Sequence, residues 1–178
     1  MANSPHIADP LDLDEIVKYH DDVLSALYAF FRNSSRDFTA RYGGHNAEEI
    51  QAFLTARLEE TDLRSALILL AAVEAAFRID YQVRCKQKLK DDLSREFRGL
   101  YKKYELRVRL EDDILEVWKK YCPGQGALIG ELRGAFKFRH WLAHGRYYDP
   151  KLGRRYDYQS VFTLADAALH DLEFKSSA

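Results

Sequence analysis

The sequence has only two cysteines among its 178 residues, Cys85 and Cys122, and neither belongs to a CxxC pair or to a cluster of metal-ligand types. This excludes a disulfide-rich scaffold and favours two reduced thiols. Four prolines and nine glycines are too few for a collagen-like or low-complexity chain. With 47% hydrophobic and 31% charged residues, the composition is that of an ordinary globular domain.

Long hydrophobic runs are also missing. The longest, Ala66 to Phe77, is interrupted by Glu74 and falls short of the roughly 20 residues that a membrane-spanning helix needs. The N-terminal residues lack the basic stretch followed by an apolar stretch that forms a secretory signal. We therefore expect a cytoplasmic protein with no membrane partner.

Several catalytic signatures are absent as well. The sequence contains no HExxH, no GxxxxGK(S/T) loop, no GxSxG elbow and no acidic cluster with the spacing of two-metal ligands. We therefore expect neither a metal ion nor a cofactor.

A strong helical pattern is present instead, because apolar residues recur at three- and four-residue steps along most of the chain. Asn46 has the sequence context of an N-cap, and Thr61 that of a cap for the long central helix that follows. Helices are expected over residues 12–42 (with a bend or break at 33–35), 47–60, 63–88, 95–104, 110–121, 127–144 and 156–172. Short connections and the absence of a strand pattern predict one all-α domain spanning residues 1–178. We expect a bundle of about six to seven helices, with residues 1–12 flexible and 173–178 forming a tail.

The net charge of −1 conceals an alternation along the chain. Residues 78–109 and 133–155 each carry a net charge of +6, whereas residues 1–77 carry −7. A basic block is most often a solvated helix face, so this pattern alone leaves contact with nucleic acid open.

The most unusual segment has two imidazoles and two guanidiniums within eight residues, namely Arg139, His140, His144 and Arg146. Imidazole is suited to proton transfer near neutral pH, and a guanidinium forks onto phosphate oxygens. Together these groups suffice for attack of a ribose 2′-hydroxyl on the adjacent phosphodiester, which requires no metal. The simpler interpretation is that they cap carbonyls where a helix stops at Gly145.

The spacing within this segment raises a geometric problem. On an unbroken helix, Arg139 and His144 would point about 140° apart. Either the helix end near Gly145 relaxes this angle, or a second copy of the chain supplies part of the site.

Other residues are candidates for supporting roles. Glu74 lies inside an apolar run with Arg78 one turn later, so it either forms a simple i,i+4 ion pair or orients Arg139 or His144. Basic and aromatic residues alternate after the motif, a pattern suited to RNA backbone and unstacked bases. These candidate RNA-binding residues are Arg146, Tyr147, Tyr148, Lys151, Arg154 and Arg155.

The segment Arg139-x4-His144, which runs Arg-His-x-x-Ala-His, resembles the R-x4-6-H signature of the HEPN superfamily. HEPN domains are all-α bundles, and many are metal-independent endoribonucleases of toxin–antitoxin and other defence systems. They typically form dimers in which two motifs build a composite site. The resemblance implies that His144 is the acid/base, that Arg139 binds the scissile phosphate, and that His140 orients the site or binds a second phosphate.

The resemblance also implies partners: RNA, with tRNA as one candidate, a second copy of the chain, and a cognate antitoxin or other regulator. Some HEPN toxins are silenced by modification of a tyrosine two positions after the motif histidine. Here that position is Arg146, a departure from the pattern. Two other functions fit the same residues: an HEPN-like dimer that binds RNA, nucleotide or protein without turnover, and a structural adaptor or antitoxin-like inhibitor.

Overall fold

The computed structural model describes residues 12–32 and 35–175, and these form seven α-helices and no strand. The helices are α1 (Leu13–Arg32), α2 (Arg36–Tyr42), α3 (Ala47–Lys86), α4 (Asp92–Tyr104), α5 (Leu115–Tyr121), α6 (Gly126–Ala143) and α7 (Tyr158–Asp171). A π-helical turn, η2 (Leu110–Ile114), leads directly into α5. The all-α class expected from the sequence is confirmed.

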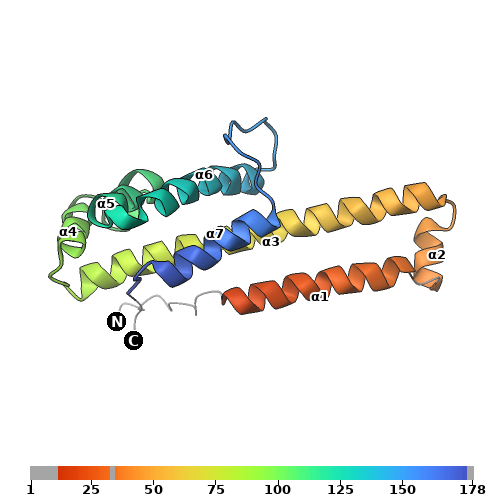
Figure 1. Cartoon of the computed structure of the whole chain (residues 1–178), viewed down its shortest axis with the longest axis horizontal. Helices are drawn as coiled ribbons and strands as arrows, with labels where there is room; N and C mark the ends of the chain where they lie inside the picture. The colour runs from red at the N-terminus through yellow and green to blue at the C-terminus, as the bar shows by residue number, and fades with distance from the viewer. Residues whose placement is uncertain (1–11, 33–34, 176–178) are drawn as a thin grey trace, which may run out of the picture.

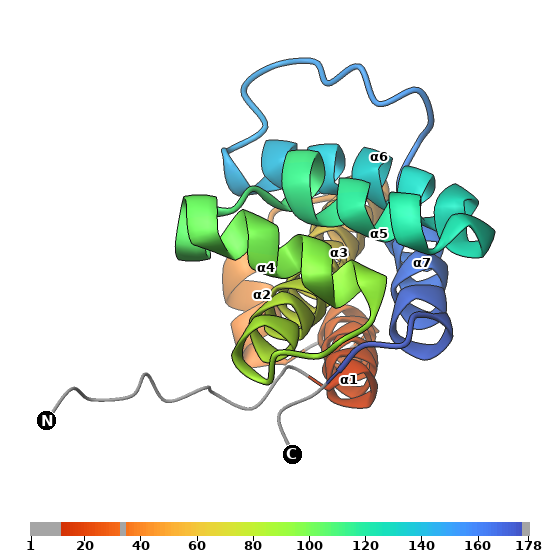
Figure 2. The ribbon, with the colours of Figure 1, turned by 90° about the vertical axis from the view of Figure 1, so that its left-hand side faces the viewer.

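Helix α3 is the axis of the molecule, and α1, α4, α6 and α7 all pack against it. In Figure 1, α1 runs beside the first half of α3, while α4, α5 and α6 cover its second half. Viewed end-on in Figure 2, α5 and α6 lie above α3, α1 lies below it, and α7 lies at its right flank. The core therefore surrounds the second half of α3, where Leu69, Leu70, Val73 and Phe77 are fully buried.

The sequence expectation of a helix break at Thr61 is wrong, because α3 continues for 40 residues without interruption. Its start is as expected: the Asn46 side chain accepts a hydrogen bond from the Glu49 amide, and the Glu49 carboxylate accepts one from the Asn46 amide. The Thr61 hydroxyl instead donates to the Arg57 carbonyl one turn back. Threonine makes this bond inside a helix as readily as it caps one.

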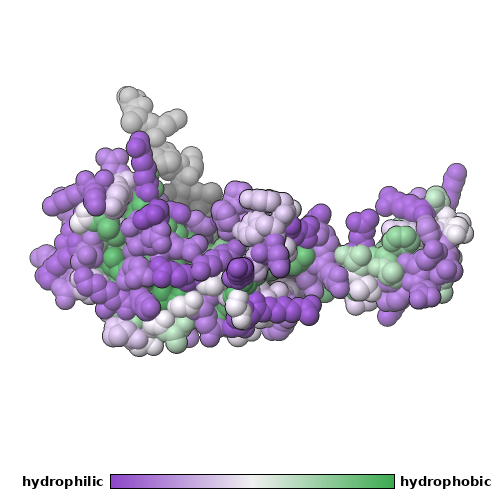
Figure 3. Space-filling model, turned by 90° about the horizontal axis from the view of Figure 1, so that it is seen from above, coloured by the Kyte–Doolittle hydropathy of each residue, from purple (hydrophilic) through white to green (hydrophobic). Residues whose placement is uncertain are grey.

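The first half of α3 and α1 form an arm that α2 closes at its far end (Figure 1). None of the described residues between 21 and 64 is buried. Five aromatic rings cluster at the tip of this arm, with centroid separations of 5.2 to 6.3 Å, and Figure 3 shows the apolar surface there. They belong to Phe30, Phe31, Phe38, Tyr42 and Phe53.

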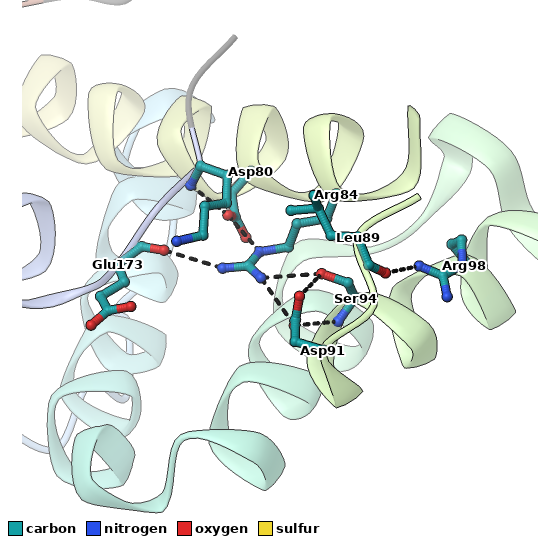
Figure 4. Close-up of polar contacts among 8 residues, drawn as sticks. Asp80, Arg84, Leu89, Asp91, Ser94, Arg98 and Glu173 are labelled. Atoms are coloured by element: carbon teal, nitrogen blue, oxygen red, sulfur yellow. Dashed lines mark hydrogen bonds and ion pairs between the residues drawn. The ribbon is translucent and has the colours of Figure 1, made fainter. Parts of the chain in front are cut away.

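A buried guanidinium joins the end of α3 to the start of α4 (Figure 4). Arg84, 5% exposed, donates from Nε to Asp80 at 2.7 Å and from Nη1 to Asp91 and Ser94 at 3.2 and 3.1 Å. Asp80 is fully buried, and burial raises the pKa of its carboxyl although Arg84 opposes the shift. The carboxylate of Asp80 therefore depends on Arg84 as its charge partner.

The same pair holds the C-terminal segment. Arg84 Nη2 donates to the Glu173 carbonyl at 3.1 Å, and the Lys175 amide donates to Asp80 at 2.8 Å. The Phe174 ring packs edge-on against Phe77, with a centroid separation of 4.9 Å. Residues 173–175 of the expected tail are thus packed on the core. Residues 176–178 lie outside the described part, and so do residues 1–11 of the segment 1–12 that was expected to be flexible.

The structure also bears on the two cysteines and on the lack of a long apolar segment. Cys85 and Cys122 are both free thiols, and burial raises the pKa of Cys85 to about 11. A thiol with so high a pKa is protonated and unreactive near neutral pH. Within residues 12–32 and 35–175, no helix combines the length and apolar character needed to cross a membrane.

Replacing Arg84 with methionine is expected to lower the free energy of unfolding by about 3–5 kcal/mol, because Asp80 would keep a buried charge without its cation. Urea unfolding followed by circular dichroism measures the loss. Arg95→Met is the matched control, since Arg95 pairs with Asp92 at 2.8 Å on the exposed face of α4 and such pairs contribute about 0–1 kcal/mol. Asp80→Asn combined with Arg84→Met should recover part of the loss. Similar losses in the Arg84 and Arg95 variants would contradict the assignment.

Candidate active site

The candidate motif lies on the last turns of α6, which ends as the glycine predicts. His144 is the C-cap residue, and Gly145 adopts a left-handed conformation with φ of 82°. The Arg146 amide donates to the Trp141 carbonyl at 3.1 Å and the Gly145 amide to the Leu142 carbonyl at 3.4 Å. This bond pair is a Schellman motif, which satisfies carbonyls that the helix end would otherwise leave without partners.

Arg139 points back toward α3. Its Nη2 lies 3.1 Å from Glu74 Oε2, and the other oxygen of Glu74 accepts a 2.7 Å hydrogen bond from Arg78 Nε. Glu74 therefore makes both contacts considered from the sequence, the i,i+4 pair and the contact with the motif arginine. The Nε of Arg139 is buried and has no hydrogen-bond partner among the described residues.

The two motif histidines contact each other. Their ring centroids lie 4.1 Å apart with an interplanar angle of 47°, and both residues are exposed. No hydrogen bond or ion pair joins Arg139 to His144 in the described part of the chain, because α6 remains helical through Ala143 and keeps the two side chains on different faces. His140 bridges this gap: it lines the same pocket as Arg139 and touches His144.

Two adjoining pockets, which we call the groove, meet at His140 and Glu111, since these two residues line both. The first pocket, about 560 Å³, has guanidiniums from three elements: Arg78, Arg109 and Arg139. The second, about 360 Å³, has Lys137, Tyr148 and Lys151. The groove thus places basic side chains on both sides of an imidazole, although Glu74, Glu111 and Asp112 also line it.

Sequence reasoning did not single out Arg109, Lys137 or Glu111 as site residues. Arg109 is the last residue of one basic block and Lys137 lies in the other, so the charge pattern was the available signal. Lys137 lies one turn before His140 on α6, whereas Arg109 precedes η2 and reaches the groove only through the tertiary packing.

The structure does not bring the candidate RNA-binding residues together on one surface: two form ion pairs, two line the groove and one lines another pocket. Arg146 pairs with Glu60 of α3 at 2.8 Å, and Arg154 pairs with Glu131 of α6 at 3.1 Å. Lys151 and Tyr148 line the groove, and Tyr147 beside them is 81% exposed. Arg155 instead lines a separate pocket on the other flank of α6.

The α6–α7 connection (residues 144–157) is anchored at Tyr156, which is 6% exposed. The Tyr156 ring stacks on Phe138 with centroids 5.4 Å apart, and its hydroxyl fits over Gly134, where a Cβ atom would overlap it. Trp141 Nε1 donates to the Tyr148 carbonyl at 2.7 Å and holds the start of the same connection. The absence of a side chain at Gly134 thus allows Tyr156 to approach the α6 backbone closely.

Within residues 12–32 and 35–175, no group of three or more His, Cys, Asp and Glu side chains is arranged to hold a metal ion. No family model matches the sequence, and neither the curated proteins nor the solved structures include a match to it. The chemistry of the groove must therefore be argued from its own residues.

Gly134→Ala is expected to lower the free energy of unfolding by about 1–3 kcal/mol, because the added methyl group would displace the Tyr156 hydroxyl. Gly130→Ala, one turn earlier on α6, is the matched control. A Cβ at Gly130 meets no atom within 4 Å, so the same change should stabilise the protein by up to about 1 kcal/mol through helix propensity. Denaturant unfolding of both variants measures the difference; a Gly134 variant as stable as the Gly130 variant would show that Tyr156 does not anchor the connection.

Proposed function

We propose that this chain is a metal-independent endoribonuclease of the HEPN kind, acting in the cytoplasm as a toxin or anti-phage defence effector. The observation that carries the proposal is the groove, which Arg139 and His140 line together and in which the His140 ring contacts His144. These are the group types that an internal transesterification of RNA requires.

The reaction needs two proton transfers. A base removes the proton of the ribose 2′-hydroxyl as its oxygen attacks phosphorus, and an acid protonates the 5′-oxygen as the P–O5′ bond breaks. The products are a 2′,3′-cyclic phosphate and a 5′-hydroxyl. The pair His140 and His144 offers one imidazole for each transfer, and Arg139, whose Nη2 is held by Glu74, stabilises charge on the phosphate.

The nucleophile belongs to the substrate, which explains a preference for RNA over DNA: only the 2′-hydroxyl can attack. The basic residues on both sides of His140 suit the phosphates that flank the scissile one. The exposed Tyr147 suits an unstacked base. Selectivity is expected to come from the fit of a structured RNA such as tRNA, because a net charge of −1 provides little bulk attraction.

The divergence of Arg139 and His144 supports a composite site in a homodimer. Since one protomer holds these side chains on different faces of α6, a two-fold partner would bring a second copy of each toward the same phosphate. A cognate antitoxin or other regulator belongs to the same proposal.

One observation favours the non-catalytic alternative, an HEPN-like module that binds RNA, nucleotide or protein. Glu74 already contacts Arg139, and Glu60 contacts Arg146, so carboxylates of the chain itself neutralise two of the motif's guanidiniums. A module of this kind would bind RNA with an affinity that falls steeply with salt, but it would release no cleaved product.

The test is incubation of the purified protein with total tRNA and with structured RNA in excess EDTA, followed by analysis of the product ends. The wild type should cleave and leave 2′,3′-cyclic phosphates or their opened forms. Arg139→Ala and His144→Ala should each lower the rate by at least about 10²-fold. His170→Ala is the matched control, because this exposed histidine on α7 interacts only locally with Asp166.

Equal cleavage by the wild type and His144→Ala would remove the catalytic proposal. Binding to the same RNA without any cleavage would favour the non-catalytic module. A cleavage that EDTA abolishes would contradict the metal-independent reaction.

A further inference from the structure

A second pocket lies on the other flank of α6 from the groove, and we call it the aromatic pocket. It encloses about 420 Å³ between α3, the end of α6, the α6–α7 connection and the start of α7. Pro150 and Leu152 line both this pocket and the groove, so the connection is a partition between the two. Nothing proposed for the groove accounts for this pocket.

Fixed rings form much of its wall. Phe138 stacks with Trp141 on α6, with ring centroids 5.8 Å apart, and with Tyr156 at 5.4 Å. Tyr158 stacks on the buried His20 at 3.7 Å. Because each ring is held by a stacking partner, the wall is formed before any ligand arrives, and a ligand would bind without the cost of ordering it.

The polar side chains of the aromatic pocket are mainly acidic. Glu59, Asp62, Asp149 and Asp157 line it, with Arg155 as the one basic residue among the lining side chains. Burial raises the pKa of Asp62; His20 opposes the shift, and Asp157 and Glu59 add to it. The four carboxylates outnumber the single arginine, so the pocket carries a net negative charge at neutral pH beside its aromatic rings. Such an environment repels phosphate groups.

We propose that the aromatic pocket binds an organic cation carried on an aliphatic stem, of the alkylammonium or alkylguanidinium class. The stem packs against the partly exposed rings of Trp141 and Tyr158, and the carboxylates pair with the cationic groups. Two sources offer this chemistry, a free polyamine and an arginine side chain of another protein. The spread of four carboxylates around about 420 Å³ favours the polyamine, whose several charges are separated along one chain.

Isothermal titration calorimetry of the full chain with spermidine, at constant ionic strength, tests the proposal without any measurement of activity. Glu59→Gln combined with Asp149→Asn should weaken spermidine binding by about tenfold or more, because two cation contacts are lost. The matched control is Asp37→Asn combined with Glu48→Gln, which removes the same charge at the exposed tip of the arm. Circular dichroism verifies that both double variants remain folded.

Two further titrations use Mg²⁺ and arginine whose α-amino and carboxyl groups are both blocked. Tighter binding of spermidine than of blocked arginine supports the free polyamine, and the reverse order assigns the pocket to an arginine of a protein partner. The proposal is overturned if Mg²⁺ displaces spermidine at equal charge concentration, or if the tip variant loses as much affinity as the pocket variant. Neither result bears on RNA cleavage, so this inference and the proposed function can fail separately.

Discussion

The packing of α1, α4, α6 and α7 against one uninterrupted helix is the constraint on which the structure depends. Helix α3 is 40 residues, or about 60 Å, long, and three of its carboxylates pair with arginines at successive positions along it. Glu60 holds Arg146 of the α6–α7 connection, Glu74 holds Arg139 of the motif, and Asp80 holds Arg84. A break at Thr61 would separate the first of these contacts from the other two.

The sequence predicts helix starts and ends well, because each depends on only a few neighbouring residues. The Asn46 capping box and the Gly145 stop are both where the pattern places them. Thr61 was misjudged because a threonine followed by an acidic residue is compatible with a cap and with a helix interior, and only packing decides between them. The packed residues 173–175 were missed because their partners, Asp80 and Arg84, are about ninety positions away.

In the candidate site, too, the sequence predicts what is local and misses what depends on tertiary packing. Arg139, His140 and His144 are close in sequence, so their clustering at a helix end follows from the pattern alone. Their different surroundings do not follow from it: Arg139 contacts Glu74 of α3, while His140 lines a groove that Arg109, from a distant part of the chain, completes. The RNA-binding role expected of Arg146 and Arg154 is also weakened, because Glu60 and Glu131 already pair with them. Counting charges along the sequence does not reveal these pairs, since both glutamates lie outside the basic block.

The ion pairs between these arginines and carboxylates of the chain itself limit how strongly the groove could bind an anion. A phosphate entering the groove would meet guanidiniums whose charge is partly neutralised by Glu74 and Asp112. General attraction would therefore be weak, and binding would depend on well-placed contacts with the side chains that line the groove. On the other flank of α6, the carboxylates of the aromatic pocket repel the same phosphate. The connection anchored by Tyr156 separates these two environments, so their charges would direct a polyanion at the end of α6 to the histidine side.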